Sequence, residues 1–285
     1  MFRSVALDTL RVLAISGPDR VGFLQGQLTQ DVTAARPDRT ILAGWADAKG
    51  RLLFSGHLCV LPIAAEEALA LLVPAELADA LAKRLRLYVL RVKAQVSLPD
   101  IAITGLLGEG ALADHGRSGM PSVQAYGDGS RHFAFSATAT PVLPGVEGAP
   151  CSEWELAEIR AGIPVILPAT RGEFVPQMVN LDLLGGISFT KGCYTGQEIV
   201  ARMKYLGRVK RRMLHFSCAE LPPAAGAPVY GERGVVGQVV RAAPAAGSSE
   251  FLAVLVLDDL PGPFFLDVGR VHAARRLELP YEVAG

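Results

Sequence analysis

Alternating apolar and polar positions divide the first hundred residues into short strands and two helices. Strands are expected where apolar residues recur at every second position, namely at 5–16 (as a pair), 41–45, 51–60 and 89–96. A short helix is expected from Pro18 or Asp19, because glycine and proline interrupt the pattern there. Residues 66–88 place leucines on one face, which predicts a long helix. Antiparallel strands backed by helices indicate an α+β layer.

The pattern of apolar and turn-forming residues changes near residue 207. Before that point, residues 101–107 resemble the start of a second such unit, and a helix is expected from Ser152 to a stop at Gly162. Beyond it, short apolar segments alternate with turns that contain proline or glycine, at 211–216, 235–241, 251–257 and 264–271. This spacing predicts a small β-barrel or sandwich, with a domain boundary near residue 207.

The overall composition fits a large hydrophobic core and a balanced charge. The chain has 285 residues, of which 50% are hydrophobic, with 28 basic and 28 acidic side chains. A neutral total argues against nucleic-acid binding by the whole surface but leaves room for a local basic patch. No apolar run approaches the roughly 18–20 residues of a membrane span, and the N-terminus has no signal-peptide pattern. We therefore expect a cytoplasmic protein without a membrane segment.

The cysteines do not form a metal-binding pattern. None of the four is paired at C-x-x-C spacing; they are Cys59, Cys151, Cys193 and Cys218. No zinc or iron–sulfur cage is expected within one segment, and no disulfide is expected in a reducing compartment.

The most informative stretch is Lys191–Glu198, with the sequence KGCYTGQE. Thr195 and Glu198 have the spacing of a capping box, which predicts a helix with Thr195 as its N-cap. Cys193 would then lie near the positive end of the helix dipole and beside Lys191, an environment that lowers a thiol pKa. The alternative is that Cys193 is a small buried residue in a turn.

Other candidate residues keep two interpretations each. Trp154 is either a core residue or a stacking platform, and the turn 47–50 is most simply a hairpin. The basic run from Arg202 to Arg212 is either a solvated strand edge or an anion site. A histidine base for Cys193 is not identified, because the five histidines are scattered, so hydrolase chemistry is not supported.

At Lys191–Glu198 the sequence resembles the YgfZ family, and the resemblance runs from about residue 7 to 212. The other segments that carry it are Leu24–Gln27 with Asp31-Val32, Asp47–Gly50, Ala161–Ile166, Pro176-Gln177, Asn180-Leu181, Leu184–Phe189, Val200–Arg202, Gly207 and Lys210-Arg211.

The resemblance implies the fold of the glycine-cleavage T-protein (aminomethyltransferase), an α+β fold with three subdomains around a central channel. Residues 1–207 would form a folate-binding domain of two intertwined α+β subdomains, and 208–285 a C-terminal β-barrel. The implied function is tetrahydrofolate binding, or binding of a derivative, by an accessory protein that supports assembly or repair of iron–sulfur clusters. Its implied partners are folate and client iron–sulfur proteins, including radical enzymes that modify tRNA. A monomer is expected, with no direct DNA binding.

The resemblance also implies roles for individual residues. Cys193 is the functional thiol and Lys191 its neighbour, and no metal ligands are assigned. Folate contacts are expected from Trp154, Asp47, Gln197 and Arg202. The rest of the motif supports the site through Gly192, Tyr194, Thr195, Gly196 and Glu198.

Two departures from the related sequences bear on activity. Leu10 stands where the family has a second folate-contacting tryptophan, and residues 51–55 lack the acidic pair of true aminomethyltransferases. We therefore expect an accessory factor with little or no turnover. The alternatives are a folate-dependent one-carbon transferase with Asp47 or Glu198 as base, and a partner-docking module that uses residues 202–212.

Overall fold

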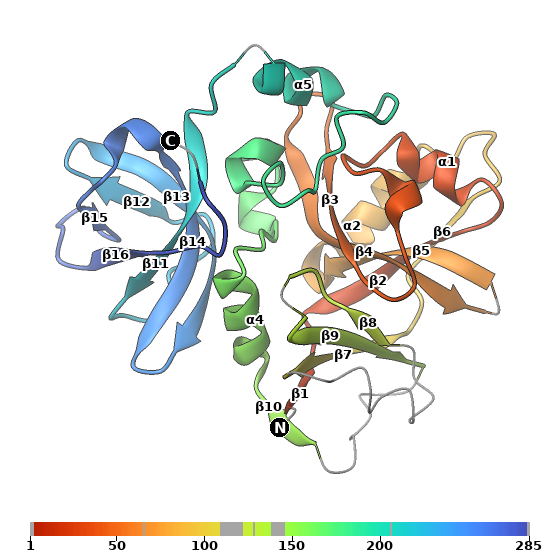
Figure 1. The fold of residues 1–285 in the computed structure, drawn as a ribbon, viewed down its shortest axis with the longest axis horizontal. Coiled ribbons are helices and arrows are strands. Elements are labelled where there is room, and N and C mark those ends of the chain that lie inside the picture. The colour runs from red at the N-terminus through yellow and green to blue at the C-terminus, as the bar shows by residue number, and fades with distance from the viewer. Residues whose placement is uncertain are drawn as a thin grey trace.

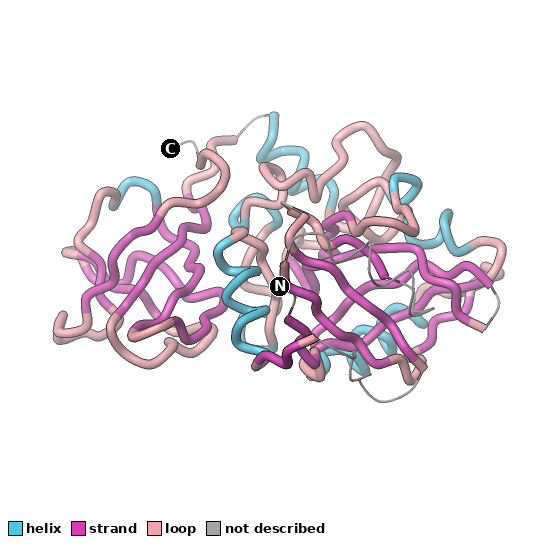
Figure 2. The backbone as a smooth tube through the Cα atoms, turned by 60° about the horizontal axis from the view of Figure 1, so that its bottom comes forward, coloured by secondary structure: helices cyan, strands magenta, loops and turns pink. Residues whose placement is uncertain are grey.

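The computed structural model describes residues 3–64, 66–108, 122–127, 129–137, 146–205 and 207–283. Within these ranges the chain forms two five-stranded sheets and one closed barrel. Figure 1 shows the barrel on one side, the two sheets on the other, and helix α4 (Cys151–Arg160) between them. The turned view of Figure 2 keeps the same separation.

The first sheet combines the N-terminal strand with strands from the middle of the chain. In spatial order its strands are β10 (Glu147–Ala149), β1 (Arg3–Ala6), β7 (Ala102–Leu107), β9 (Arg131–Ser136) and β8 (Ser122–Gln124). Strand β1 pairs in parallel with β10 and antiparallel with β7. The sheet is therefore complete only when residues 3–6 and 147–149 are both in place.

The second sheet is antiparallel and contains the strands between. In spatial order these are β3 (Ile41–Ala46), β4 (Leu52–Ile63), β5 (Glu66–Pro74), β2 (Leu10–Ser16) and β6 (Gln95–Ser97). Alternate residues of β2 enter different cores, because side chains of a strand point to opposite faces. Leu13 and Ile15 face one core, and Val12 and Ala14 face another that is shared with the first sheet.

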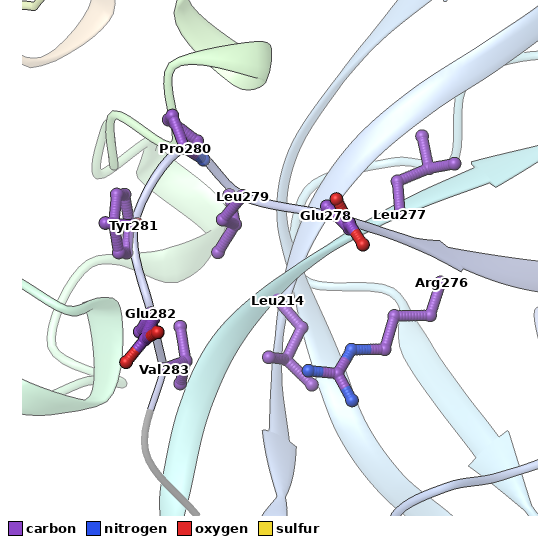
Figure 3. A pocket seen from close by; sticks show the side chains of 9 residues that line it. All are labelled: Leu214, Arg276, Leu277, Glu278, Leu279, Pro280, Tyr281, Glu282 and Val283. Carbon is purple, nitrogen blue, oxygen red and sulfur yellow. The ribbon is translucent and has the colours of Figure 1, made fainter.

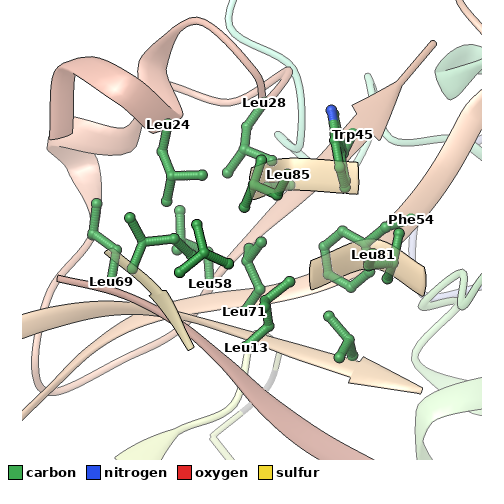
Figure 4. Packing of buried hydrophobic residues seen from close by; sticks show 14 of the residues in the cluster. Leu13, Leu24, Leu28, Trp45, Phe54, Leu58, Leu69, Leu71, Leu81 and Leu85 are labelled. Carbon is green, nitrogen blue, oxygen red and sulfur yellow. The ribbon is translucent and has the colours of Figure 1, made fainter. Parts of the chain in front are cut away.

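Helices α1 (Arg20–Gln25) and α2 (Ala75–Arg86) border the core on the outer face of the second sheet. Figure 4 shows Leu81 and Leu85 beside Leu71 and Leu13, with Trp45 at one side of the cluster. Helix α2 places buried residues at positions 77, 78, 81, 82 and 85, the spacing of an amphipathic helix.

Two expectations for the N-terminal half are wrong. Strands β1 and β2 do not pair with each other, since they belong to different sheets. Residues 66–88 are not one helix, because 66–74 form β5 and only 75–86 are helical. Strand β5 has buried residues on both faces, so its Ala- and Leu-rich sequence lacks the polar alternation of a half-buried strand. Pairing with β4 and β2 overrides the helix propensity of this sequence.

The strand expected at 89–96 is also reduced to residues 95–97. Arg91 has a φ of 66°, which no extended strand accommodates. The strands expected at 41–45 and 51–60 are confirmed, as are the short helix near Asp19 and the helix that stops before Gly162. The start of a second unit expected at 101–107 is the strand β7 of the first sheet.

The C-terminal region is a closed β-barrel, as predicted. Its strands, in spatial order, are β11 (Arg211–Cys218), β14 (Ser248–Val256), β13 (Gly234–Ala245), β12 (Pro228–Gly231), β15 (Phe264-Phe265) and β16 (Ala273–Leu277). Phe216 and Phe251 stack inside it with ring centroids 5.3 Å apart.

Helices contribute little of the structure. Besides those named, the described residues include α5 (Gln197–Tyr205) and the 3-10 turns η1 (Val32–Ala34), η2 (Pro168–Thr170), η3 (Pro176–Val179) and η4 (Leu257–Asp259). In the described ranges we find no helix with the length and apolar character needed to cross a bilayer.

The barrel is joined to the rest of the protein by a hydrophobic core that includes Ile159 of α4 and Leu252 of β14. After β16 the chain returns to this junction, where the Tyr281 hydroxyl donates to the Gly162 carbonyl and accepts from Asn180. The division into two domains at residue 207 stays a prediction.

Candidate functional site

The motif Lys191–Glu198 packs against the hairpin turn 47–50. Asp47 Oδ1 closes this turn by accepting from the backbone N–H groups of Lys49 and Arg51 at 2.8 and 2.9 Å. Gly196 has a φ of +83°, and a Cβ at this position would overlap the Asp47 carbonyl oxygen. Glycine is required at position 196 for both reasons. The structure thus brings Asp47 next to the motif.

Thr195 is not the N-cap that the capping-box pattern predicts. Helix α5 begins at Gln197, and the positive φ of Gly196 keeps that residue outside the helix. The backbone N–H of Thr195 instead donates to the carbonyl oxygen of Gly26. Cys193 therefore lies four residues before the first helical residue, farther from the helix than the sequence pattern indicates.

Lys191 connects the motif to the segment that follows α1. Its Nζ donates to the carbonyl oxygens of Leu28 and Gln30 at 2.7 and 2.9 Å, and it lies 5.1 Å from the ring centroid of Tyr194. Burial lowers the pKa of Lys191 to about 8, while the charge of Asp31 opposes this shift. Lys191 therefore joins the motif loop to the segment that contains Leu28 and Gln30.

Cys193 is exposed, which rules out its alternative interpretation as a small buried residue. The contrast with Cys59 is marked, since burial raises the pKa of that thiol to about 12. All four cysteines are free, and the part of the chain that the structure describes contains no group of three or more His, Cys, Asp or Glu side chains suited to a metal ion. An exposed thiol is accessible to a partner or a small molecule.

A cavity of about 90 Å³ lies where the two sheets, α4 and the barrel meet. Its lining includes Trp154 and Phe133, whose ring centroids are 4.8 Å apart, and also Leu10, where the resemblance implied a tryptophan in related sequences. Trp154 is only 3% exposed, so it is a core residue that also borders a cavity. Both interpretations of Trp154 are compatible with this position.

Charged side chains gather at one side of this cavity around the buried Glu158. Arg131 forms an ion pair with Glu158, His57 Nε2 lies 3.3 Å from its Oε2, and Arg241 Nη1 lies 4.0 Å from the same oxygen. Burial disfavours the charged form of Glu158, but Arg131 and then His57 outweigh it and hold its pKa at about 2. Burial lowers the pKa of Arg241, whose Nη1 has no hydrogen-bond partner.

The structure divides the predicted folate residues into two groups. Trp154 lines the central cavity, whereas Asp47, Gln197 and Arg202 belong to the hairpin and α5 and are absent from the described lining. Figure 1 shows α5 at the far end of the molecule from the N-terminal end of α4. The described lining of the cavity therefore contains Trp154 and none of the other three residues.

Two wider depressions lie outside this arrangement. A cleft of about 660 Å³ borders the other face of α4 at Leu156 and Arg160, and its arginines are all paired with acids. An open groove of about 640 Å³ follows the C-terminal segment beside the barrel, with Leu214 and Arg276 among its lining (Figure 3). None of the predicted site residues lines either depression.

Sequence similarity assigns the chain to a family. It is 32% identical to the tRNA-modifying protein YgfZ of Pectobacterium carotovorum subsp. carotovorum (strain PC1), over 98% of this chain and 91% of that protein. The chain belongs to the YgfZ family. The protein of the same name from Yersinia pseudotuberculosis serotype O:1b (strain IP 31758) is also 32% identical, over 78% of this chain and 73% of its own length. A search against protein-family models found no match.

A solved structure confirms the expected fold. The glycine cleavage system aminomethyltransferase T from Bartonella henselae superposes with a TM-score of 0.76, over 98% of this chain and 85% of that chain. The sequence identity is 15%, so this likeness shows the fold alone. The YgfZ-family chain therefore has a T-protein-like fold with a closed six-stranded barrel.

The family motif does not reveal the charged lining of the cavity. His57 was not distinguished from the other scattered histidines, and Glu158 and Arg241 were not identified as candidates. Glu158 lies four residues after Trp154, a spacing that places both on one face of a helix, and this signal was available in the sequence. Arg241 has no local signal, because it comes from a barrel strand far along the chain.

Proposed function

We propose that this YgfZ-family chain binds tetrahydrofolate, or a derivative, in the central cavity and serves as an accessory factor for iron–sulfur client enzymes. The observation that carries the folate proposal is that Nη1 of Arg241 has no hydrogen-bond partner within the described structure, in a residue that lines the same cavity as Trp154 and Glu158. A buried donor without an acceptor costs about 1–3 kcal/mol. A ligand that supplies an acceptor there is correspondingly stabilised.

The chemistry of the lining fits a reduced folate. A pterin carries N–H donors along one edge and a carbonyl oxygen beside them, and its ring is flat. The ionised Glu158 carboxylate would accept from such donors, Arg241 would donate to an oxygen, and Trp154 would provide an aromatic wall. These residues bind and orient, and none of them is assigned a step of chemistry.

The volume of the cavity sets a condition on this proposal. Pockets for small molecules usually hold about 300–1,000 Å³, whereas this cavity holds about 90 Å³. Binding therefore requires that side chains of the lining shift outward. Folate binding should consequently change the environment of the Trp154 ring, which makes its fluorescence a direct probe.

The iron–sulfur part of the proposal rests on the exposed Cys193 in a loop held by Lys191. One thiol cannot complete a four-ligand cluster site, and the described residues offer no further cluster of ligands. A cluster would therefore be cargo, with its other ligands supplied by the client or by a small thiol. Curated relatives are named as tRNA-modifying proteins, and we extend this to clients that modify tRNA.

A one-carbon transferase is the less favoured alternative because no base is found. Asp47 and Glu198 do not line the central cavity in the described structure. Glu158 does, but a pKa of about 2 makes it a poor proton acceptor at neutral pH. In segment 51–55, which lacks the acidic pair of aminomethyltransferases, Ser55 lines the cavity, and its Oγ donates to the Pro164 carbonyl.

The first experiment titrates tetrahydrofolate into a protein that contains a single tryptophan. The chain has two tryptophans, so Trp45→Phe leaves only Trp154 as a reporter. We expect saturable quenching in Trp45→Phe and no such signal in Trp154→Phe. Calorimetry on the wild type that shows no binding up to about 1 mM, equivalent to about −4 kcal/mol, would contradict the proposal and favour a docking module.

The same titration tests Arg241. Arg241→Met removes the unpaired donor and should weaken folate binding by about tenfold or more, because hydrogen bonds to charged groups contribute about 1.5–3 kcal/mol. The matched control is Arg275→Met, an exposed arginine of β16, which should bind as the wild type does. Equal affinities for both variants would place folate outside this cavity.

The thiol role is tested in cells that depend on this protein. Cys193→Ala should lower the amount of thiolated tRNA made by iron–sulfur radical enzymes while leaving folate affinity unchanged. Cys151→Ala is the control, since Cys151 is half-buried at the start of α4. Undiminished thiolation in Cys193→Ala would eliminate the thiol role without affecting the folate proposal.

The remaining assignments are part of the same proposal. We place the protein in the cytoplasm as a monomer without direct DNA binding, with domains at 1–207 and 208–285. The four free cysteines support a reducing compartment. Size-exclusion chromatography with light scattering checks the oligomeric state, and a chain that elutes as a dimer would overturn that assignment.

A further inference from the structure

An exposed cationic face extends from the end of α5 to the first residue of the barrel. It consists of Arg202, Lys204, Arg208, Lys210 and Arg211, which we call the α5 basic face. All five side chains are exposed, and no residue between 199 and 219 is acidic. Figure 1 shows α5 and the following linker at the outer edge of the molecule.

None of these five cations forms an ion pair with an acid within the described structure. The next residue, Arg212, is buried and forms two hydrogen bonds with Asp182. Arg131 and Arg160 are likewise paired with acids. Five exposed cations without acidic partners between residues 202 and 211 attract anions, and they exceed what edge protection of one strand needs.

Aromatic rings lie within the α5 basic face. Tyr205 is 67% exposed and meets Phe189 edge to face, with ring centroids 6.3 Å apart. Lys204 Nζ lies 5.2 Å from the centroid of Phe189. The face therefore offers an open tyrosine ring, held in place from one side and surrounded by positive charge.

We propose that the α5 basic face binds single-stranded RNA, with its phosphates on the five cations and an unpaired base stacked on Tyr205. Phosphate binding by lysine and arginine together with base stacking on an aromatic ring is the general mode of single-strand recognition. Unpaired bases are available in RNA loops, where such stacking is common. A duplex offers the phosphates without the free base.

An acidic protein surface is the competing partner, and the composition of the face disfavours it. Protein interfaces are centred on buried apolar and aromatic anchors with a polar rim. Among the described residues of 199–211, Tyr205 is the only large hydrophobic side chain that is exposed. The surface thus has the charge for a polyanion without the apolar centre of a protein interface.

The test measures fluorescence anisotropy of a labelled 12-nucleotide RNA of mixed sequence with the full chain. Five phosphate contacts predict a slope of log affinity against log salt of about −3.5, because each contact contributes about 0.7 for a single strand. Affinity should therefore fall on the order of a hundredfold between 50 and 200 mM KCl. A salt-independent signal would overturn the proposal.

Charge-reversal variants locate the binding surface. The triple variant Arg202→Glu, Lys204→Glu, Arg208→Glu should reduce the salt slope by about 2 and abolish binding at 200 mM KCl. Its matched control makes the same change in net charge at three exposed residues elsewhere, Lys83→Glu, Arg275→Glu and Arg276→Glu. An equal loss in both triple variants would show a general charge effect and overturn the assignment.

Tyr205→Ala separates RNA from other polyanions. It should weaken binding of the RNA about tenfold, as the loss of one base stack does, and leave binding of a labelled 12-residue polyglutamate unchanged. Polyglutamate that binds more tightly than RNA, or a Tyr205→Ala variant that binds RNA as the wild type does, would overturn the RNA proposal in favour of an acidic protein. Arg241→Met should bind RNA normally, which makes this test independent of the folate site.

Discussion

The central cavity and the motif region differ in how their charged side chains are paired. At the cavity, Glu158 is buried and surrounded by Arg131, His57 and Arg241 from three different parts of the fold. At the motif region, Lys191 is held by backbone carbonyls, and no acid among the described residues pairs with the cations of α5. The cavity thus neutralises a buried carboxylate with charged side chains of the core, whereas the motif region binds its lysine through backbone carbonyls of the segment after α1 and leaves the α5 cations exposed.

The largest effect is expected from Glu158→Gln. This change leaves Arg131 and Arg241 buried without a negative charge, and breaking a buried ionic pair costs about 3–5 kcal/mol. Urea unfolding measures the loss. The control is Glu198→Gln, an exposed residue of α5, for which less than about 0.5 kcal/mol is expected. Similar stabilities of the two variants would contradict the view that the cavity depends on its charges.

Glu158→Gln should also differ from the wild type in the pH dependence of stability. Because the folded-state pKa of Glu158 is lowered from 4.5 to about 2, its stabilisation is fully present above pH 4.5 and is lost as the pH falls toward 2. The wild type should therefore lose stability over this range more steeply than Glu158→Gln. Parallel curves for the two proteins would show that folding does not lower the pKa of Glu158.

The next effect is expected within the motif, where two glycines give a matched pair. Gly196→Ala should destabilise by about 1–3 kcal/mol, because it strains the positive φ and pushes Cβ against the Asp47 carbonyl. Gly192→Ala should change stability by less than about 0.5 kcal/mol, since nothing lies within 4 Å of the added carbon. A reversed order would mean that the motif loop does not hold this conformation against the hairpin.

A smaller effect is expected from Lys191 at alkaline pH. Burial lowers its pKa from 10.5 to about 8, so between these values the unfolded chain binds the proton more than the folded chain does. The contribution of Lys191 to the free energy of unfolding should therefore rise with pH from about 8 to 10.5. Unfolding of wild type and Lys191→Met across this range measures it, and a constant difference would contradict the shift.

The smallest effect is expected on the α5 basic face. Lys204→Glu should change the free energy of unfolding by no more than about 0.5 kcal/mol, because the side chain is exposed and has no ion-pair partner within the described residues. Thermal unfolding checks this, with Lys83→Glu as the exposed counterpart on α2. A large destabilisation would assign these cations a structural role.

The sequence predicted local features better than long-range ones. The hairpin at 47–50, helix α4 and the barrel follow from turn residues and periodicity, which act over a few positions. The partners of β1 and β2 could not be predicted, because alternation identifies a strand and not its neighbours. The prediction for the Ala- and Leu-rich β5 was wrong for a related reason, since burial on both faces removes the polar alternation.

The candidate site shows the same division. Cys193 and Lys191 were found through a contiguous motif, and the structure shows the thiol exposed. The N-cap predicted at Thr195 lies one position too early. The start of α5 depends on the backbone angle of Gly196, which the sequence pattern does not show. Arg241 could not be found, since a strand of the barrel brings it to α4 only in the folded protein.

The split of β1 and β2 between two sheets has a consequence for biosynthesis. All strands of the second sheet lie within residues 10–97, so a nascent chain can assemble that sheet early. Strand β1 is synthesised before the second sheet, yet its parallel partner β10 at residues 147–149 is made much later. During that interval β1 has an unpaired edge. A chaperone could bind this edge, and a chain released too early would expose it to other chains.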